Sequence, residues 1–336
     1  MKILVPITHS YEMDILNPQQ YNTEFFCGYL PEWWTERFNH NDSDSTLSVP
    51  LNNRNDKKAN VSSRDELATI IKKAKAYHTD VFLALNAKYY PNYAFDSIGT
   101  YLDEVVSLGI TRMIVCDIGM IQYLRTNYPQ IKVSVSCLNQ ATNTKAVEFY
   151  QSFGNVDRVV FPRHMSSDEI ERIALNVTNL SFEYFIFSNK CLFDDGYCRG
   201  IHAFTPVCKD LFYADFYSRN NSVINAKERT RLEIAEYIFA RWTRNELLCQ
   251  EKNICTPNFA CSACSLLKLN KITNIESVKI SIRGHNVDEL LRQVIMADRV
   301  ITLVKNGADH SDIKETVAKL YGKETLCSEG TSCMMI

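Results

Sequence analysis

Short apolar runs alternate with amphipathic segments along most of the chain. Seven runs of six residues have the length and composition of buried strands, and an eighth, "SVKISI", follows much later at 277–282. The first seven lie at residues 2–7, 24–29, 81–86, 112–117, 132–137, 158–163 and 182–187. Apolar runs of this length that alternate with helices indicate parallel strands joined by helical crossovers.

The segments between these runs carry the end signals of helices. After a polar loop that starts at residue 53, the predicted helices end near residues 78, 109, 128, 154 and 177. Serines suit the N-caps of two of them and glycines the C-terminal ends of two others: Ser62 or Ser63, Ser166 or Ser167, Gly109 and Gly154. Each predicted strand from the third to the sixth is therefore followed by a helix.

The number and order of these elements predict a TIM-like (β/α) barrel with a cysteine-rich, partly helical region inserted before its last strand. An open doubly wound sheet is the alternative, although no G-x-G-x-x-G follows the first strand. The expected division is a barrel body at 1–190, a cysteine-rich region with a long amphipathic helix at 191–276, the last strand and helix at 277–322, and a tail at 323–336. The polar stretch 36–60 is expected to be a long loop, which either covers a site at the barrel mouth or is simply solvated.

Composition and charge narrow the class of protein. The apolar fraction of 46% and the charged fraction of 23% are those of a soluble globular chain. The net charge of −2 creates no overall attraction to nucleic acid or anionic lipid, but it leaves room for a local basic channel. No apolar stretch approaches a membrane span and the N-terminus is no secretory signal, so we expect a cytoplasmic protein with reduced thiols.

Seven of the twelve cysteines fall between residues 191 and 264. They are Cys191, Cys198, Cys208, Cys249, Cys255, Cys261 and Cys264, of which the last two form a C-x-x-C pair. Three interpretations remain open: an iron–sulfur cluster, a tetrahedral zinc site, or thiols that pack as small apolar groups. Outside this region we expect Cys27, Cys116 and Cys137 to be buried, and Cys327 and Cys333 to be free thiols at the surface.

Several polar side chains stand where predicted strands end. Asp117 and Asn86 each end a strand, where barrel enzymes place functional groups, although each also suits the cap of the next helix. Arg163 ends another strand and is followed by His164. We expect one of these two side chains to face the barrel mouth.

Glu183 interrupts an apolar strand, "SFEYFIF". An ionised carboxylate in such a strand needs a partner, and we expect an ion pair with Lys279 or Arg283. Together with Arg54 on the polar loop, which could grip a carboxylate or phosphate, these side chains make up the predicted catalytic set: Arg54, Asp117, Arg163, Glu183 and Arg283.

An ordered series of segments resembles the peptidase U32 family over roughly residues 1–300. The segments are "VFLALNAKYYP", "LGITRMIVCDIGMIQYLR", "VSVSCLNQATNTKAVEFY", "VDRVVFPRHMSSDEIERI", "FEYFIFSNKCLFDDGYC" and "CSACSLLKLNKITNIESVKISIRG". The resemblance implies a protein of oxygen-independent hydroxylation that carries a [4Fe-4S] cluster and acts on a quinone precursor, an RNA base or a peptide. It also implies an anionic co-substrate such as prephenate as the oxygen source. The Asn53–Arg54 pair resembles the family's Asn-Arg loop.

The resemblance assigns cluster ligands residue by residue. Cys191 and Cys198 match the family's C-x6-C pair, and Cys208 is the natural third ligand. The fourth is Cys261, with Cys264 as a close rival and Cys255 as a weaker candidate.

Two features depart from the family pattern. "FSNKC" stands where a His-Gly pair is usual, and Ile282 replaces a glycine in the "K-I-x-G-R" motif. The loss of that glycine puts close approach of the backbone to a ligand in doubt. These departures indicate a divergent branch of the family, whose substrate need not be a quinone or an RNA. Two alternatives to a hydroxylation enzyme are a peptidase and a non-catalytic partner subunit of a modification complex.

Overall fold

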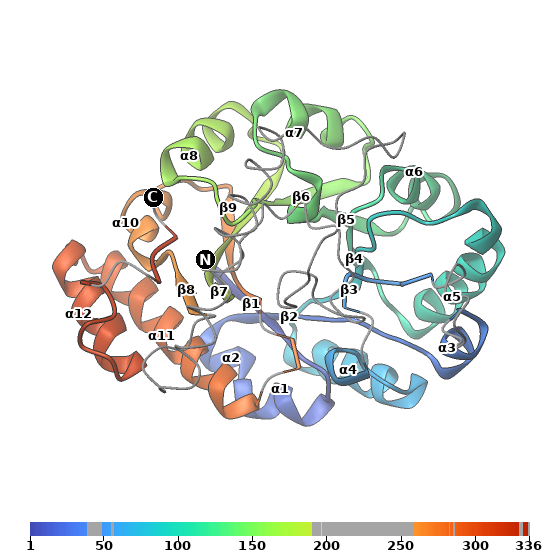
Figure 1. Ribbon diagram of the computed structural model, residues 1–336, viewed down its shortest axis with the longest axis horizontal. Coiled ribbons are helices and arrows are strands. Elements are labelled where there is room, and N and C mark those ends of the chain that lie inside the picture. Colours follow the sequence, from blue (N-terminus) through green and yellow to red (C-terminus); the bar gives the residue numbers. More distant parts are fainter. Residues whose placement is uncertain are drawn as a thin grey trace, which may run out of the picture.

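Eight parallel strands form a closed barrel in the computed structural model, and helices surround it (Figure 1). The structure describes residues 1–38, 49–54, 57–189, 196, 259–281, 283–284, 286–328 and 332–334. The barrel strands are β1 (Lys2–Pro6), β2 (Thr23–Cys27), β3 (Val81–Leu85), β4 (Arg112–Val115), β5 (Lys132–Val135), β6 (Val156–Val160), β7 (Ser181–Asn189) and β9 (Ile275–Ile280).

The strands follow one another around the barrel in chain order. Each of the first seven pairs in parallel with the next, and β9 lies between β7 and β1. The β6–β7 and β9–β1 pairings close the sheet, so the TIM-like barrel is confirmed and the open doubly wound sheet is wrong. A ninth strand, β8 (Phe259–Cys261), pairs antiparallel with the end of β7.

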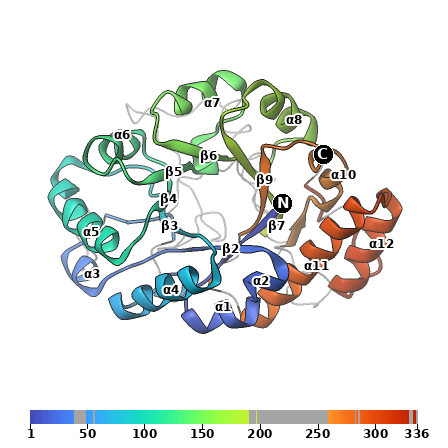
Figure 2. The same ribbon diagram turned by 180° about the vertical axis from the view of Figure 1, so that it is seen from behind.

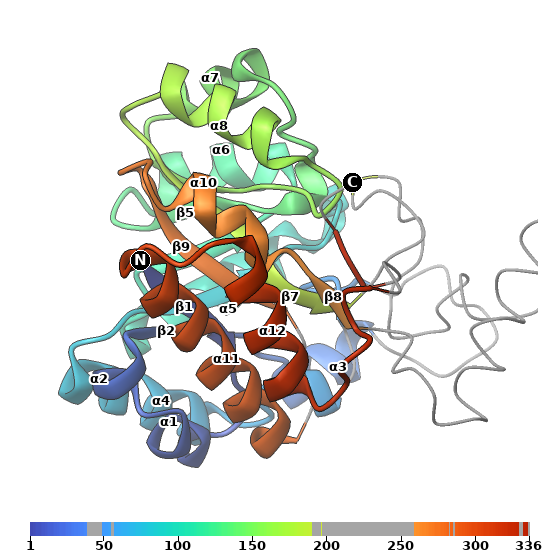
Figure 3. The same ribbon diagram turned by 90° about the vertical axis from the view of Figure 1, so that its left-hand side faces the viewer.

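Helices form the outer ring, which Figure 2 shows from behind. They are α1 (Ser10–Leu16), α2 (Pro18–Tyr21), α3 (Glu32–Phe38), α4 (Arg64–Tyr77), α5 (Phe95–Leu108), α6 (Ile118–Asn127), α7 (Thr144–Gln151), α8 (Ser167–Asn176), α10 (Leu266–Leu269), α11 (Val287–Lys305) and α12 (His310–Tyr321). Figure 3 shows α11 and α12 together along one flank of the barrel.

The predicted end signals are mostly confirmed. Ser63 caps α4 and Ser166 caps α8 through their side chains, and Gly109 closes α5 in the left-handed conformation. The prediction for Gly154 is wrong, because α7 ends at Gln151 and Ser152 is its cap. The long amphipathic helix predicted at 225–248 lies outside the described residues.

Alternation along the strands divides the apolar side chains into two groups. One set packs outward against the helices and forms the main core, with Val5, Phe25 and Leu83 among its members. A separate cluster inside the barrel consists of Leu4, Phe26, Phe82 and Ile114. Successive side chains of a strand point to opposite faces, so every second residue of each strand faces the interior. The four residues of this cluster come from four of the eight strands and therefore fill only part of the interior. Other interior positions carry charged side chains, among them Glu24, Arg158 and Glu183.

Candidate functional site

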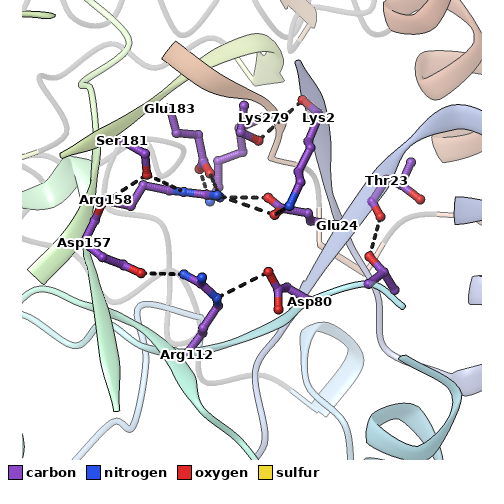
Figure 4. Close-up of polar contacts among 12 residues, drawn as sticks. Lys2, Thr23, Glu24, Asp80, Arg112, Asp157, Arg158, Ser181, Glu183 and Lys279 are labelled. Atoms are coloured by element: carbon purple, nitrogen blue, oxygen red, sulfur yellow. Dashed lines mark hydrogen bonds and ion pairs between the residues drawn. The ribbon is translucent and has the colours of Figure 1, made fainter. Parts of the chain in front are cut away.

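A buried ion network fills the end of the barrel where the strands begin (Figure 4). The Arg158 guanidinium donates to Glu24 at 2.9 Å and to Glu183 at 3.1 Å. Lys279 Nζ lies 2.9 Å from the other oxygen of Glu183. These four side chains are at most 7% exposed, so their charges are satisfied by one another rather than by water.

The network shifts the proton affinities of its members. Burial alone would raise the pKa of Glu24, but the charge and hydrogen bond of Arg158, together with Lys2, lower it overall. Burial opposes the charge of Arg158, yet Glu24 and Glu183 raise the pKa of Arg158 above its usual value. Both side chains therefore remain charged at neutral pH.

The expected ion pair of Glu183 is thus confirmed with Lys279, and Arg158 is an additional partner that sequence reasoning missed. Arg112 bridges Asp80 and Asp157 at the rim of the same end, beside a cavity of about 510 Å³. In TIM barrels the end where the strands begin serves stability, whereas catalytic groups gather at the opposite end. Glu183 therefore contributes to the buried network, away from the C-terminal mouth.

The C-terminal mouth, where the strands end, holds a buried group of polar side chains around Gly28. Asn52 donates to Asn60 at 2.8 Å, and the Arg283 guanidinium donates to Asn52 Oδ1 at 3.1 Å. A Cβ at Gly28 would lie 1.9 Å from Asn60 Oδ1 and 2.6 Å from an Arg283 nitrogen. Only glycine fits at this position, because the three side chains occupy the space directly above β2.

The polar stretch predicted at 36–60 is only partly a loop. Its first residues belong to α3, and residues 49–52 are buried at the mouth rather than solvated. The Arg54 backbone N–H donates to Asn52 Oδ1, and its carbonyl accepts from Asn60. These bonds hold the predicted Asn-Arg loop at the mouth, next to Arg283.

Gly284 fixes how the last barrel strand meets this loop. Its φ of +79° is one that residues with a Cβ rarely adopt, and an added Cβ would lie 2.9 Å from the Lys58 carbonyl oxygen. The glycine after Arg283 is therefore required by the close approach of two backbone segments. Ile282, which replaces the family's glycine, lies outside the described residues.

The loop after β3 connects the mouth to the segment that contains the predicted cluster ligands. Asn86 accepts a hydrogen bond from the Asn53 backbone N–H. Lys88 Nζ donates to the Gly196 carbonyl at 3.1 Å, and Gly196 also lies against Gln140 from the loop after β5. Gly196 stands between Cys191 and Cys198 in the sequence, so one point of this segment is fixed at the C-terminal mouth.

The remaining predicted side chains take different positions at this end. Asp117 accepts a hydrogen bond from the Met120 N–H at 2.7 Å and caps α6, as its alternative interpretation predicted. Arg163 donates to Ser188, which also bonds Ser281, and its guanidinium lies over the Phe185 ring. Arg54, Arg163 and Arg283 therefore lie on loops that follow different strands at one mouth.

Four of the described cysteines form an unexpected group on the flank next to α12: Cys261, Cys264, Cys327 and Cys333. Cys333 forms a β-bridge with Cys261, whose N–H bonds Ser332 at 2.7 Å and whose carbonyl accepts from Met334 at 2.9 Å. Burial, together with the thiols of Cys327 and Cys333, raises the pKa of Cys264 to about 11. Cys327 and Cys333 are partly exposed thiols, in line with the prediction, but they lie beside Cys261 and Cys264.

Other thiol predictions have mixed outcomes. Cys27 and Cys116 are buried as expected, and burial raises the pKa of each to about 12, but Cys137 is only half-buried. Within the described part of the chain, no three His, Cys, Asp or Glu side chains are arranged to hold a metal ion. The other cysteines of the rich region lie outside the described residues: Cys191, Cys198, Cys208, Cys249 and Cys255.

The family model described as peptidase family U32 matches residues 48–326. A segment of 97 residues is 32% identical to tRNA hydroxylation protein P of Escherichia coli (strain K12), and covers 29% of this chain and 21% of that protein. A segment of 134 residues is 29% identical to tRNA hydroxylation protein P1 of Bacillus subtilis (strain 168), and covers 40% of this chain and 31% of that protein. These matches span less than a third of the relatives' length.

The solved structure of the U32 peptidase Mk0906 is also similar, at 13% identity and a TM-score of 0.42, over 56% of this chain and 70% of that chain. None of the helices in the described ranges is long and apolar enough to cross a membrane. The family model covers well over half of the 336 residues and ends just beyond α12. The chain therefore belongs to peptidase family U32.

Proposed function

We propose that this protein holds an iron–sulfur cluster at the C-terminal mouth of its barrel and takes part in the oxygen-independent hydroxylation of a tRNA base. The observation that carries the proposal is the anchoring of Gly196 by Lys88 at that mouth. The segment between Cys191 and Cys198 is thereby tied to the end of the barrel where this fold gathers its chemistry. The relatives named as tRNA hydroxylation proteins support the reaction and the substrate.

The donor set suits a soft metal centre. Thiolates are the usual ligands of iron–sulfur clusters, and irregular spacing is normal when they come from separate loops. Strand β7 ends at Asn189, two residues before Cys191, and Asn189 pairs with Phe259 of the strand that carries Cys261. The segment with the first two proposed ligands and the strand with the fourth thus begin from the same place in the fold.

The fourth ligand is either Cys261 or Cys264. Cys261 lies on β8 and accepts a hydrogen bond at its sulfur from the Ala263 N–H, at 3.5 Å. Burial raises the pKa of the Cys261 thiol well above its usual value, and this hydrogen bond opposes that shift, because it offers positive charge to the thiolate sulfur. This favours Cys261, with Cys191, Cys198 and Cys208 as the other ligands. A bound cluster would supply electron transfer or an open iron site.

The arginines at the mouth would bind an anionic co-substrate. Arg283 is 6% exposed and its guanidinium is oriented by Asn52, so little reorganisation is needed when an anion binds at the mouth. Arg163 is oriented by Ser188 and by the face of Phe185. Fixed guanidinium groups match the geometry of carboxylates, which suits a small organic acid as the oxygen donor.

The first experiment is purification of the full chain without oxygen. Broad absorbance near 400 nm with about four iron and four sulfide ions per chain is the expected result. Cys191→Ser and Cys198→Ser should each lower the iron content strongly, whereas Cys27→Ala, which changes a thiol in the outer core, should retain it. Folded wild-type protein that contains neither iron nor sulfide would overturn the proposal.

The reaction has a separate readout. The tRNA of cells that lack the protein, analysed by mass spectrometry after digestion, should lose a nucleoside that carries one extra oxygen atom. Expression of the wild-type chain should restore this nucleoside, and Arg283→Lys should restore it poorly because a lysine cannot form the two-pronged bond. Unchanged nucleosides in the deletion strain would exclude this substrate.

A further inference from the structure

Two tyrosines project from the loop after β3 beside the C-terminal mouth. Tyr89 is 60% exposed and Tyr93 is 54% exposed, the largest exposed fractions among the aromatic side chains of the described residues. Within that part of the chain, neither has a hydrogen bond or a ring contact. Apolar rings of this size are costly to leave in water, so two on one short loop indicate a binding surface.

The loop that carries them is held rigidly on both sides of Tyr89. Tyr90 is buried and donates its hydroxyl hydrogen to the Leu51 carbonyl at 2.7 Å. Lys88 is bound to Gly196, and the Ala94 N–H closes a turn on Pro91 at 2.9 Å. The side chains of Lys88 and Tyr90 thus anchor the loop, while those of Tyr89 and Tyr93 project outward. Because the loop is already ordered, its backbone loses little conformational entropy when a ligand binds the two tyrosines.

Basic side chains lie on several loops at the same end of the barrel, although the net charge of the chain is −2. The loops after β2, β3 and β6 carry exposed or partly exposed ones, among them Arg54, Lys57, Lys58, Lys88 and His164. The acidic side chains at this end include Asp117, which is engaged as a helix cap, and Asp65, Glu66 and Asp96 in the first turns of α4 and α5. A cationic rim beside exposed aromatic rings is the combination that binds single-stranded nucleic acid.

We propose that Tyr89 and Tyr93 form a stacking platform for unpaired bases of the RNA substrate, next to the mouth where the chemistry takes place. The inference rests on the proposed function and names the residues that position its substrate. Tyrosine faces stack on any base, while the cations on the neighbouring loops bind the phosphates. Between the two tyrosines the chain has Tyr90, which is buried, then Pro91 and Asn92, so the two rings do not form the continuous apolar face that a protein partner would need.

The test measures binding of a fluorescein-labelled RNA hairpin with an unpaired loop of tRNA sequence to the anaerobically purified full chain. Tyr89→Leu and Tyr93→Leu should each weaken binding roughly tenfold, and Tyr89→Phe and Tyr93→Phe should retain most of the affinity, because stacking uses the ring. Phe149→Leu, at a half-exposed ring on helix α7, is the matched control and should change nothing. A fully paired RNA duplex should be insensitive to all of these substitutions.

The outcomes separate the two proposals. Wild-type protein that contains the cluster but binds no RNA would overturn both the RNA substrate and the platform. RNA binding that both leucine variants retain at full strength would overturn the platform alone. Equal loss of hairpin and duplex binding would also overturn it, because stacking requires unpaired bases. The circular dichroism spectrum and the iron content of each variant must match those of the wild type. We expect this match because the replaced side chains are exposed and their loss should not disturb the fold.

Discussion

Replacement of Glu183 by glutamine should test whether the buried network holds the barrel together. Glu183 is fully buried and accepts from Arg158 at 3.1 Å and from Lys279 at 2.9 Å. At these distances each ion pair has a gross attraction of roughly 5 kcal/mol at an effective dielectric constant of about 20, most of which offsets the cost of removing the charges from water. Glutamine keeps the shape of the side chain but removes its charge.

The cost should fall mainly on Lys279. In the variant Arg158 still has the Glu24 carboxylate as a partner, at 2.9 Å. Lys279 has no such second partner, because among the described residues Glu183 is the one carboxylate it contacts. Its other contact there is the face of the Phe26 ring. Breaking a buried pair from one side typically costs 3–5 kcal/mol, so Glu183→Gln should lower the free energy of unfolding by about 3–5 kcal/mol. Urea denaturation followed by circular dichroism measures this change.

A double-mutant cycle gives the decisive comparison. Lys279→Met removes the stranded cation, so the double variant should be more stable than Glu183→Gln alone by at least about 1.5 kcal/mol. Lys145→Met breaks the exposed pair with Glu148 and should change the free energy of unfolding by less than about 0.5 kcal/mol. A cost below about 1 kcal/mol for Glu183→Gln, or strict additivity in the cycle, would refute the reasoning.

Three further predictions concern other parts of the barrel. The pKa of Glu24 is lowered in the folded state, so its contribution is complete above the usual value of 4.5 and is lost as the pH falls through the folded pKa. The stability difference between wild type and Glu24→Gln should thus be constant from about pH 7 to 5.5 and shrink below about pH 4.5; a constant difference at lower pH would contradict this. Gly28→Ala should destabilise the protein by about 1–3 kcal/mol and impair function, because its Cβ would displace the buried mouth group. The control is Gly99→Ala, at a position inside α5 where an added Cβ would make ordinary contacts; it should be neutral or stabilise the protein by up to about 1 kcal/mol. An equal effect of Gly28→Ala and Gly99→Ala on stability would contradict the crowding at Gly28. In cluster-free folded protein, Cys264 should react with iodoacetamide slowly at pH 8 and faster toward pH 11, since its pKa is about 11, and rapid reaction at pH 8 would exclude the raised pKa.

The strands and the ring of helices were readable from the sequence because each is specified locally. A six-residue apolar run, a serine cap or a closing glycine acts on its own neighbours, so Ser63, Gly109 and Ser166 could be placed without the fold. The need of Glu183 for a cation was also readable, since a lone carboxylate in an apolar strand is costly. The pattern of one charge in a buried strand could have revealed Arg158 in the same way.

The mouth group could not be found by such reasoning. Asn52 and Asn60 carry no local signal, and their partner Arg283 is 231 positions away from Asn52 in the chain. The meeting of Cys261 with Cys333 depends on where the tail crosses β8, which no periodicity encodes. Sequence reasoning therefore located the correct end of the barrel but not the contacts that orient its side chains.

Closure of the barrel joins the earliest strand to the latest one. β1 pairs with β9, and the Ser277 hydroxyl lies beside the Lys2 carbonyl, 275 positions earlier. During synthesis β1 and β2 leave the ribosome long before β9 exists, so one edge of the nascent sheet stays open for most of translation and is vulnerable to wrong pairing. Arg283 follows β9 directly, which means that the mouth is completed last. A group that binds at this mouth therefore finds a complete site only after β9 has paired with β1.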